Sequence, residues 1–214
     1  DLPGRAERGT LVPDVDLMEV IQNPETHRWV QECADKAVTL VKNQGVLPLS
    51  PEKTKRVYLN VIEAEIKNNT PFALDIKSRL EKEGFAVTLR EREMHFDPAE
   101  MFSDTPSPDM LRILSEIMSG TDAFVSQYDL AMIVVNLPTV SNATTVRINW
   151  AVLSGLGNDM PWYAGEMPLV VVSMANPYHL LDIPMAHVYV NAYSCNPETL
   201  DAVFDKLTGR SPFK

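Results

Sequence analysis

The stretch Pro168–Ser194, PLVVVSMANPYHLLDIPMAHVYVNAYS, decides the fold of this chain. It contains two apolar runs, Leu169–Val172 and Val188–Val190, separated by the proline-containing segment Asn176–Pro184. Four consecutive apolar residues predict a strand that is buried on both faces, because a half-exposed strand would alternate apolar and polar residues. Two such runs joined by a crossover predict neighbouring parallel strands in a sheet that is covered by helices on both sides.

Further strands and helices alternate before this stretch. Apolar runs at Arg56–Ile62, Ala86–Arg90 and Leu130–Leu137 predict three more strands, and the last of these is the most apolar, so we expect it at the centre of the sheet. A small polar residue followed by proline is typical of a helix start. This signature occurs at four places: Asn23-Pro24, Thr70-Pro71, Ser107-Pro108 and Asn196-Pro197.

The first of these helices is predicted to run through Val41 and to stop at Asn43–Gly45. Its apolar residues recur at helical spacing and form one stripe, which includes Cys33 and should face the core. The stripe consists of Trp29, Val30, Cys33, Ala34, Ala37, Val38 and Val41.

These elements predict one α/β domain over residues 23–214, a three-layer α/β/α sandwich around a mainly parallel, doubly wound sheet. Residues 1–22 contain glycine and proline and little periodicity, so they are interpreted as a linker or lead-in from a preceding domain. The chain begins at Asp1 without methionine, which also leads us to expect a preceding segment.

Composition narrows the classes of function. The chain has 214 residues, of which 45% are hydrophobic and 22% are charged, and its net charge is −10. This acidic balance argues against nucleic acid and anionic membranes as partners. No apolar run approaches the roughly 18 residues of a membrane-spanning helix. Two cysteines, Cys33 and Cys195, are too few for a disulfide framework. The sequence does not indicate the cellular compartment of the protein.

The motifs of several catalytic and cofactor-binding classes are missing. The histidines show no HExxH spacing, and neither cysteine lies in a CxxC pair, so no metal or other cofactor is predicted. His179 and His187 flank the crossover and are expected to be structural. The chain has no GxSxG and no phosphate-binding P-loop, and the Gly-rich segment after Ser154 only loosely imitates a dinucleotide-binding turn. We therefore assign no catalytic residue.

A long aromatic-bearing insertion, residues 138–167, separates two predicted central strands. Insertions of this length are often functional. Arg147 is expected to cap a helix, to pair with an acid inside the fold, or to reach a neighbouring domain or substrate cleft. Glu166 follows two aromatic residues of the kind that stack on sugars, although a solvent-facing carboxylate is the simpler reading. The candidates for an active-site rim or an interdomain contact are Arg147, Trp150, Trp162 and Glu166.

Three segments resemble one family of enzymes. They are ADKAVTLVKNQGVLPL at Ala34–Leu49, the paired strands VVVSMANPY and YVNAYS within Val170–Ser194, and PETLDAVFDKLTGRSP at Pro197–Pro212. Together they are similar to the C-terminal α/β/α sandwich domain of glycoside hydrolase family 3, and most closely to its bacterial β-N-acetylglucosaminidase branch. The likeness spans most of residues 25–214 in matching order.

The resemblance implies that the chemistry resides elsewhere. In this family a preceding (β/α)₈ barrel carries the nucleophilic Asp, and in the N-acetylglucosaminidase branch it also carries an Asp/His acid–base pair. Many β-glucosidase relatives instead place a catalytic Glu in the sandwich domain, but no residue here matches it by motif. The resemblance therefore implies a non-catalytic C-terminal domain of a β-N-acetylhexosaminidase, with the barrel and a carbohydrate substrate as its partners.

Two rival hypotheses stay open at this point. One is a flavodoxin-like module that binds a small molecule at the carboxyl edge of the sheet through Asn136, Asn176 and Asn191. The other is a free-standing hydrolase built on Glu166 or Ser154, for which no base or oxyanion partner can be named.

Overall fold

The computed structural model describes residues 19, 21–93, 97, 99–100, 103–118, 120–142, 147–148, 150 and 160–213. Most of the lead-in 1–22 and parts of the segments 91–106 and 138–167, including Ser154, lie outside these residues. The strands are β1 Thr39–Asn43, β2 Arg56–Glu63, β3 Ala86–Leu89, β4 Leu130–Asn136, β5 Leu169–Ser173 and β6 Val188–Asn191. The helices are α3 Pro24–Ala37, α4 Pro71–Lys82, α5 Pro108–Met118, α6 Thr121–Val125, the 3₁₀ turn η2 His179–Leu181 and α7 Pro197–Leu207.

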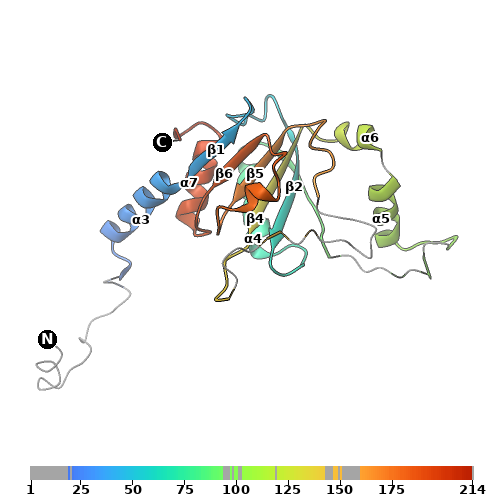
Figure 1. Ribbon diagram of the computed structural model, residues 1–214, viewed down its shortest axis with the longest axis horizontal. Helices are drawn as coiled ribbons and strands as arrows, with labels where there is room; N and C mark the ends of the chain where they lie inside the picture. The colour runs from blue at the N-terminus through green and yellow to red at the C-terminus, as the bar shows by residue number, and fades with distance from the viewer. Residues whose placement is uncertain are drawn as a thin grey trace, which may run out of the picture.

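The strands form one six-stranded sheet in the order β1-β6-β5-β4-β2-β3 (Figure 1). The last five strands of that order run parallel to one another, and β5 pairs with β6 as the apolar runs predicted. Every residue of β5 and of β6 is buried. β4 lies inside the sheet between β5 and β2, which confirms its expected central place.

The predicted helix starts are present with their caps. The Asn23 side chain accepts a hydrogen bond from the Thr26 N–H at 2.9 Å, and the Asn196 side chain accepts from the Thr199 N–H at 2.8 Å. The Thr70 hydroxyl accepts from Ala73 at 3.1 Å. These bonds satisfy N–H groups that have no partner inside the helix, so the Asx/Thr-Pro signature sets the beginning of each helix locally.

The first helix is shorter than its apolar stripe predicted. It ends at Ala37, and residues 39–43 form β1 instead of another helical turn. β1 pairs antiparallel with β6, with Leu40 opposite Val190 and an irregularity before Lys42. The outer side of β6 would otherwise present unpaired backbone groups, and pairing them outweighs the local helical pattern. The sheet is therefore mixed at this edge.

Two layers cover the sheet, and they differ in kind. On one side, called here the helix-covered face, α3, α4 and α7 pack with strand residues such as Leu59, Met132 and Val172. On the other, called the loop-covered face, α6, residues 160–167 and the β5–β6 crossover pack on Tyr58, Ile133 and Val171. The α/β sandwich is confirmed, but much of its second layer is irregular chain (Figure 1).

Candidate functional site

The carboxyl edge of the sheet has a point where the strand order reverses, between β2 and β4. Ligands of open α/β sheets commonly bind at such points. Glu63 and Asn136 lie opposite each other in register here, at the last positions of their strands. The Thr70 hydroxyl donates to the Glu63 carboxylate, which ties that side chain to the start of α4.

The Asn68 side chain connects two loops at this edge by hydrogen bonds. Asn68 Oδ1 accepts from the N–H groups of Arg92 at 2.6 Å and of Glu93 at 2.9 Å, while Asn68 Nδ2 donates to the Glu93 carbonyl at 2.7 Å. These bonds join the segment after β2 to the segment after β3. No sequence motif indicates this clamp, because the two residues that donate to Asn68 lie 24 and 25 positions after it in the chain.

A buried polar cluster links β5 to its crossover. Ser173 Oγ lies 2.8 Å from His179 Nδ1 and donates to the Asn176 carbonyl. Asn176 Nδ2 donates to the Leu137 carbonyl at 2.9 Å and lies 3.3 Å from His179 Nε2. A serine beside a histidine is the arrangement of an activated nucleophile. Here both side chains are completely buried, so the cluster holds the crossover in place, in line with the structural role expected for His179.

The neighbouring strand β6 adds two buried polar groups, Tyr189 and Asn191. Burial raises the pKa of the Tyr189 phenol above its usual value, so this hydroxyl stays protonated. Asn191 is 6% exposed, and its side-chain oxygen has no hydrogen-bond partner among the described residues. His187 Nδ1 accepts from the Leu169 N–H at 3.1 Å and is therefore part of the fold.

Arg147 forms an ion pair with Asp182 of the crossover. The Asp182 side chain is only 5% exposed, and its other oxygen accepts from the Ile148 N–H at 3.3 Å. The hydrogen bond to Asp182 raises the pKa of the Arg147 guanidinium. Of the roles considered for Arg147, pairing with an acid inside the fold is the one seen, while 56% of the side chain stays exposed. Trp150 packs partly buried on the loop-covered face.

Trp162 and Glu166 lie on the segment that leads into β5. The Trp162 ring lies 5.1 Å from Phe124 and 5.4 Å from Tyr163, measured between ring centroids, and it is 45% exposed. Phe124 precedes β4, so this aromatic cluster lies toward the amino ends of the strands, away from the carboxyl edge. Glu166 is exposed, and its backbone N–H donates to the Tyr163 carbonyl at 3.0 Å.

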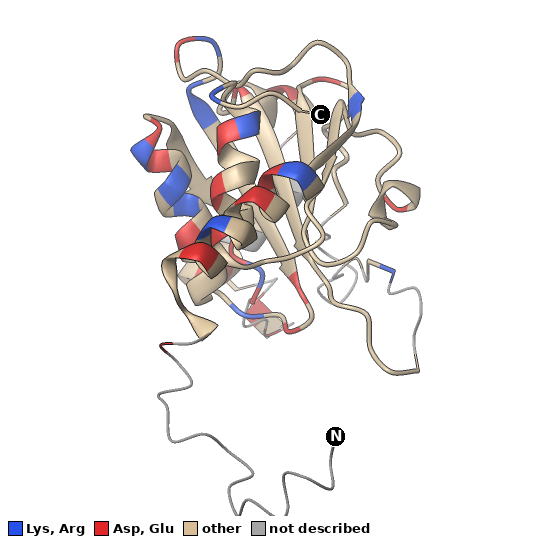
Figure 2. Cartoon of the chain, turned by 90° about the vertical axis from the view of Figure 1, so that its left-hand side faces the viewer, with Lys and Arg blue, Asp and Glu red and all other residues tan. Residues whose placement is uncertain are grey.

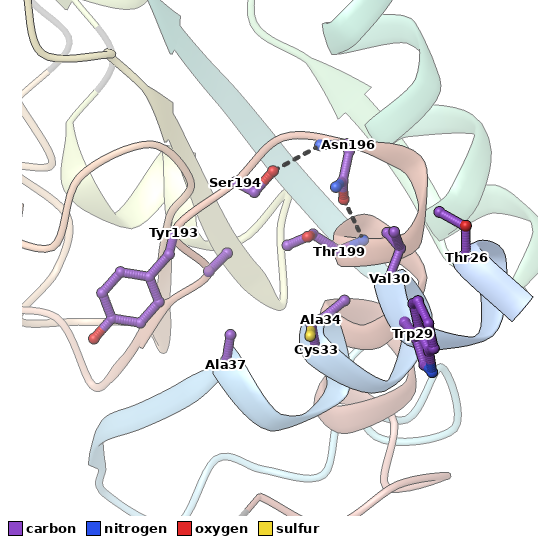
Figure 3. A pocket seen from close by; sticks show the side chains of 11 residues that line it. Thr26, Trp29, Val30, Cys33, Ala34, Ala37, Tyr193, Ser194, Asn196 and Thr199 are labelled. Carbon is purple, nitrogen blue, oxygen red and sulfur yellow. Dashed lines mark hydrogen bonds between the residues drawn. The ribbon is translucent and has the colours of Figure 1, made fainter. Parts of the chain in front are cut away.

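An apolar hollow of about 420 Å³ lies between α3 and the segment that joins β6 to α7 (Figure 3). We call it the α3 groove. Cys33 was expected to face the core, but it is exposed at this groove. The α3 side contributes Thr26, Trp29, Val30, Cys33, Ala34 and Ala37, and the other side contributes Ala192, Tyr193, Ser194, Asn196 and Thr199.

The outer surface of the helical layer is highly charged (Figure 2). Arg79 bridges Asp75, at 3.1 Å, and Asp201, and so joins α4 to α7. Arg210 bonds Asp205 at 2.7 Å and Glu83 at 2.5 Å. Both of these arginines therefore pair with acids of the same domain.

Neither a cluster of metal-ligating side chains nor a membrane-spanning helix is present in the part of the chain that the structure describes. No three His, Cys, Asp or Glu side chains there lie close enough together to hold a metal ion. Among the same residues, no helix is long and apolar enough to span a bilayer.

Comparison with known proteins gives a sequence relative. A β-N-acetylglucosaminidase/β-glucosidase of Cellulomonas fimi is 30% identical over 210 residues, which cover 96% of this chain and 34% of that protein. No family model matches the chain.

Solved structures agree with this match. A β-glucoside phosphorylase is 34% identical and superimposes with a TM-score of 0.76, over 98% of this chain and 34% of that one. A glycoside hydrolase family 3 β-N-acetylglucosaminidase from a Paenibacillus species superimposes with a TM-score of 0.54 at 15% identity, which supports the fold alone. The chain thus spans about a third of the length of the relatives it matches. The match to both relatives over nearly its whole length shows that the chain belongs to glycoside hydrolase family 3, and its mostly parallel sheet agrees with a C-terminal α/β sandwich domain of that family.

Proposed function

We propose that this chain is the non-catalytic C-terminal domain of an enzyme that cleaves β-linked N-acetylglucosamine or a related β-glycoside, and that it packs beside a catalytic barrel. The observation that carries the proposal is the match to one third of two relatives that are both named for reactions of β-glycosides. The Ser173–His179 pair is in line with it, because this nucleophile–base geometry is completely buried and closed to substrate.

The test compares the isolated chain with the full-length polypeptide on aryl β-N-acetylglucosaminides and β-glucosides. Each is assayed with and without inorganic phosphate, because one relative is a phosphorylase. We expect turnover only from the full-length protein, and the effect of phosphate then assigns water or phosphate as the acceptor. Turnover by the isolated chain at the full-length rate contradicts the proposal.

The rim role of Arg147, Trp150, Trp162 and Glu166 is part of this proposal. Arg147 and Trp162 are half-exposed and yet held in place, Arg147 by Asp182 and Trp162 by Phe124 and Tyr163. In the full-length enzyme, Arg147→Ala and Trp162→Ala are expected to raise KM about 2- to 10-fold, the effect of one lost polar or stacking contact. Leu111→Ala, at an exposed position of α5, is the matched control. Unchanged kinetics in a stably folded variant remove that residue from the rim.

Small-molecule binding is the second candidate, and two observations favour it. The parallel strands have the order β3-β2-β4-β5-β6, which is the flavodoxin-like order, and the Asn191 side-chain oxygen is buried without a described partner. Asn176, however, already donates to Leu137. A thermal-shift screen separates the two candidates, because a ligand at 100 times its Kd adds about 2.7 kcal/mol of stability.

A further inference from the structure

The starting observation is that α3 has more apolar surface than its own domain covers. Ala34 and the adjoining Val38 are buried against the sheet and α7, at 6% and 1% exposure. Trp29, Cys33 and Ala37 are exposed, and they recur every four residues, so they share one face of the helix. That face forms one wall of the α3 groove.

The opposite wall carries a second exposed aromatic side chain in an unusual backbone conformation. Tyr193 follows β6, is 49% exposed and has φ of +64°. A bulky residue rarely occupies this left-handed region, and such strain concentrates at binding and functional sites. Figure 3 shows Tyr193 and Trp29 at opposite ends of the groove, with Cys33 and Ala37 between them.

The chemistry of the groove indicates what it binds. None of its lining residues is charged, although Lys, Arg, Asp and Glu residues are frequent along the nearby helices (Figure 2). Tryptophan and tyrosine in a desolvated pocket are the residues that contribute most to protein–protein binding. An apolar hollow edged by Ser194 and Asn196 therefore suits an apolar protein side chain better than a phosphate or a charged sugar.

The position of α3 in the chain indicates which protein supplies that side chain. The relatives extend over about three times the part matched here, and α3 comes directly before β1, the first strand of the sheet, so a domain that precedes this one would connect to the sheet through α3. Covalent connection holds such a domain at a millimolar effective concentration near α3. We propose that the α3 groove is the docking surface for the preceding domain of the same polypeptide, with an apolar side chain of that domain between Trp29 and Tyr193. This inference rests on the proposed function.

Cys33 provides the readout, because its thiol lies inside the groove. Its rate of alkylation is measured by mass spectrometry in the isolated chain and in the full-length polypeptide. We expect the full-length protein to react at least tenfold more slowly at Cys33. A cysteine introduced by Leu181→Cys is the control, since Leu181 is 69% exposed on the crossover and should react equally in both.

Substitutions in the groove then test the contact itself. In the full-length protein, Trp29→Ala and Tyr193→Ala are expected to restore Cys33 alkylation at least fivefold toward the rate of the isolated chain. Tyr178→Ala is the matched control, because Tyr178 is also 49% exposed but lies outside the groove. Since both target side chains are half-exposed, the melting temperature of the isolated chain should barely change.

The outcomes separate the two claims. A full-length polypeptide without glycoside-cleaving activity overturns the proposed function. An active full-length enzyme in which Cys33 reacts as fast as in the isolated chain overturns the docking surface alone. Protection of Cys33 in the isolated chain, together with a dimer in analytical ultracentrifugation, overturns it in favour of a second copy of this domain.

Discussion

The two faces of the sheet are covered by different means. On the helix-covered face, three capped helices lay apolar side chains such as Ile76 and Leu80 on the strands at regular spacing. On the loop-covered face, irregular segments are held by an aromatic cluster around Phe124 and by the Ser173–His179 hydrogen bonds. The regular helices stabilise their face through many similar apolar contacts, whereas the irregular layer is held by a small number of specific contacts. The predictions below test this difference.

The largest expected effects come from core truncations matched across the two faces. Leu80→Ala on the helix-covered face should cost about 2–5 kcal/mol of unfolding free energy. Ile183→Ala, at an equally buried position on the crossover, should cost less, because irregular chain can collapse into the cavity more easily than a packed helix. Urea denaturation of both variants checks this, and a larger loss for Ile183→Ala would contradict the comparison.

The next effect concerns a buried charge at the end of the helical layer. Lys206 Nζ donates to Asp35 Oδ1 at 2.8 Å, to the Pro212 carbonyl at 2.8 Å and to Ser211 Oγ at 3.2 Å, and its side chain is fully buried. Lys206→Met keeps the apolar stem and removes all three bonds, so it should cost about 1.5–3 kcal/mol. Thermal unfolding measures it. Lys36→Met, at an exposed pair with Glu32, should change nothing resolvable.

A serine pair tests the hydrogen bonds of the loop-covered face. Ser173→Ala leaves the Asn176 carbonyl and His179 Nδ1 without this partner in a buried site, and should cost about 1–3 kcal/mol. Ser126 also donates to a backbone carbonyl, that of Ala123 at 2.8 Å, but it is exposed. Ser126→Ala should therefore have a much smaller effect. Equal losses in the two variants would show that burial does not set the strength of these bonds.

The smallest expected effect is a pH dependence where β2 and β4 begin. The hydrogen bond from Arg56 lowers the pKa of Asp129 below its usual value, so the folded protein binds that proton more weakly than the unfolded chain. This contribution is complete above the unfolded value of about 3.9 and is lost as pH falls through the lower folded value. Melting temperatures from pH 6 to 3 should fall less steeply in Arg56→Gln. An identical slope would exclude the linkage.

The sequence predicts the helix-covered face well because its signals are local. Capping side chains at Asn23, Thr70 and Asn196 bond within three residues of themselves, and the buried runs of β4 and β5 are continuous in sequence. What it misses depends on distant partners. Residues 39–43 form a strand because their backbone pairs with β6, which is distant in sequence. Asn68 likewise bonds a loop residue 24 positions further along the chain.

The candidate site was harder to foresee for the same reason. Pairing Arg147 with Asp182 requires knowing where the crossover lies. Cys33 is exposed because the rest of the domain covers only part of the apolar surface of α3. The spacing of apolar residues does not predict how much of that surface is covered. The apolar pattern included Trp29, Cys33 and Ala37 of the exposed face, but it placed them in one core-facing stripe with the buried Ala34 and Val38 and did not distinguish the two faces.

The bond between Lys206 and Asp35 spans 171 positions of the chain, and β1 likewise finds its partner only in β6. A ribosome adding about 5–20 residues per second takes roughly 9–34 s to cover that distance. During this interval the nascent α3 and β1 have been made but their partners have not. Their apolar side chains are then candidates for chaperone binding, and closure of the sheet must wait until β6 leaves the exit tunnel.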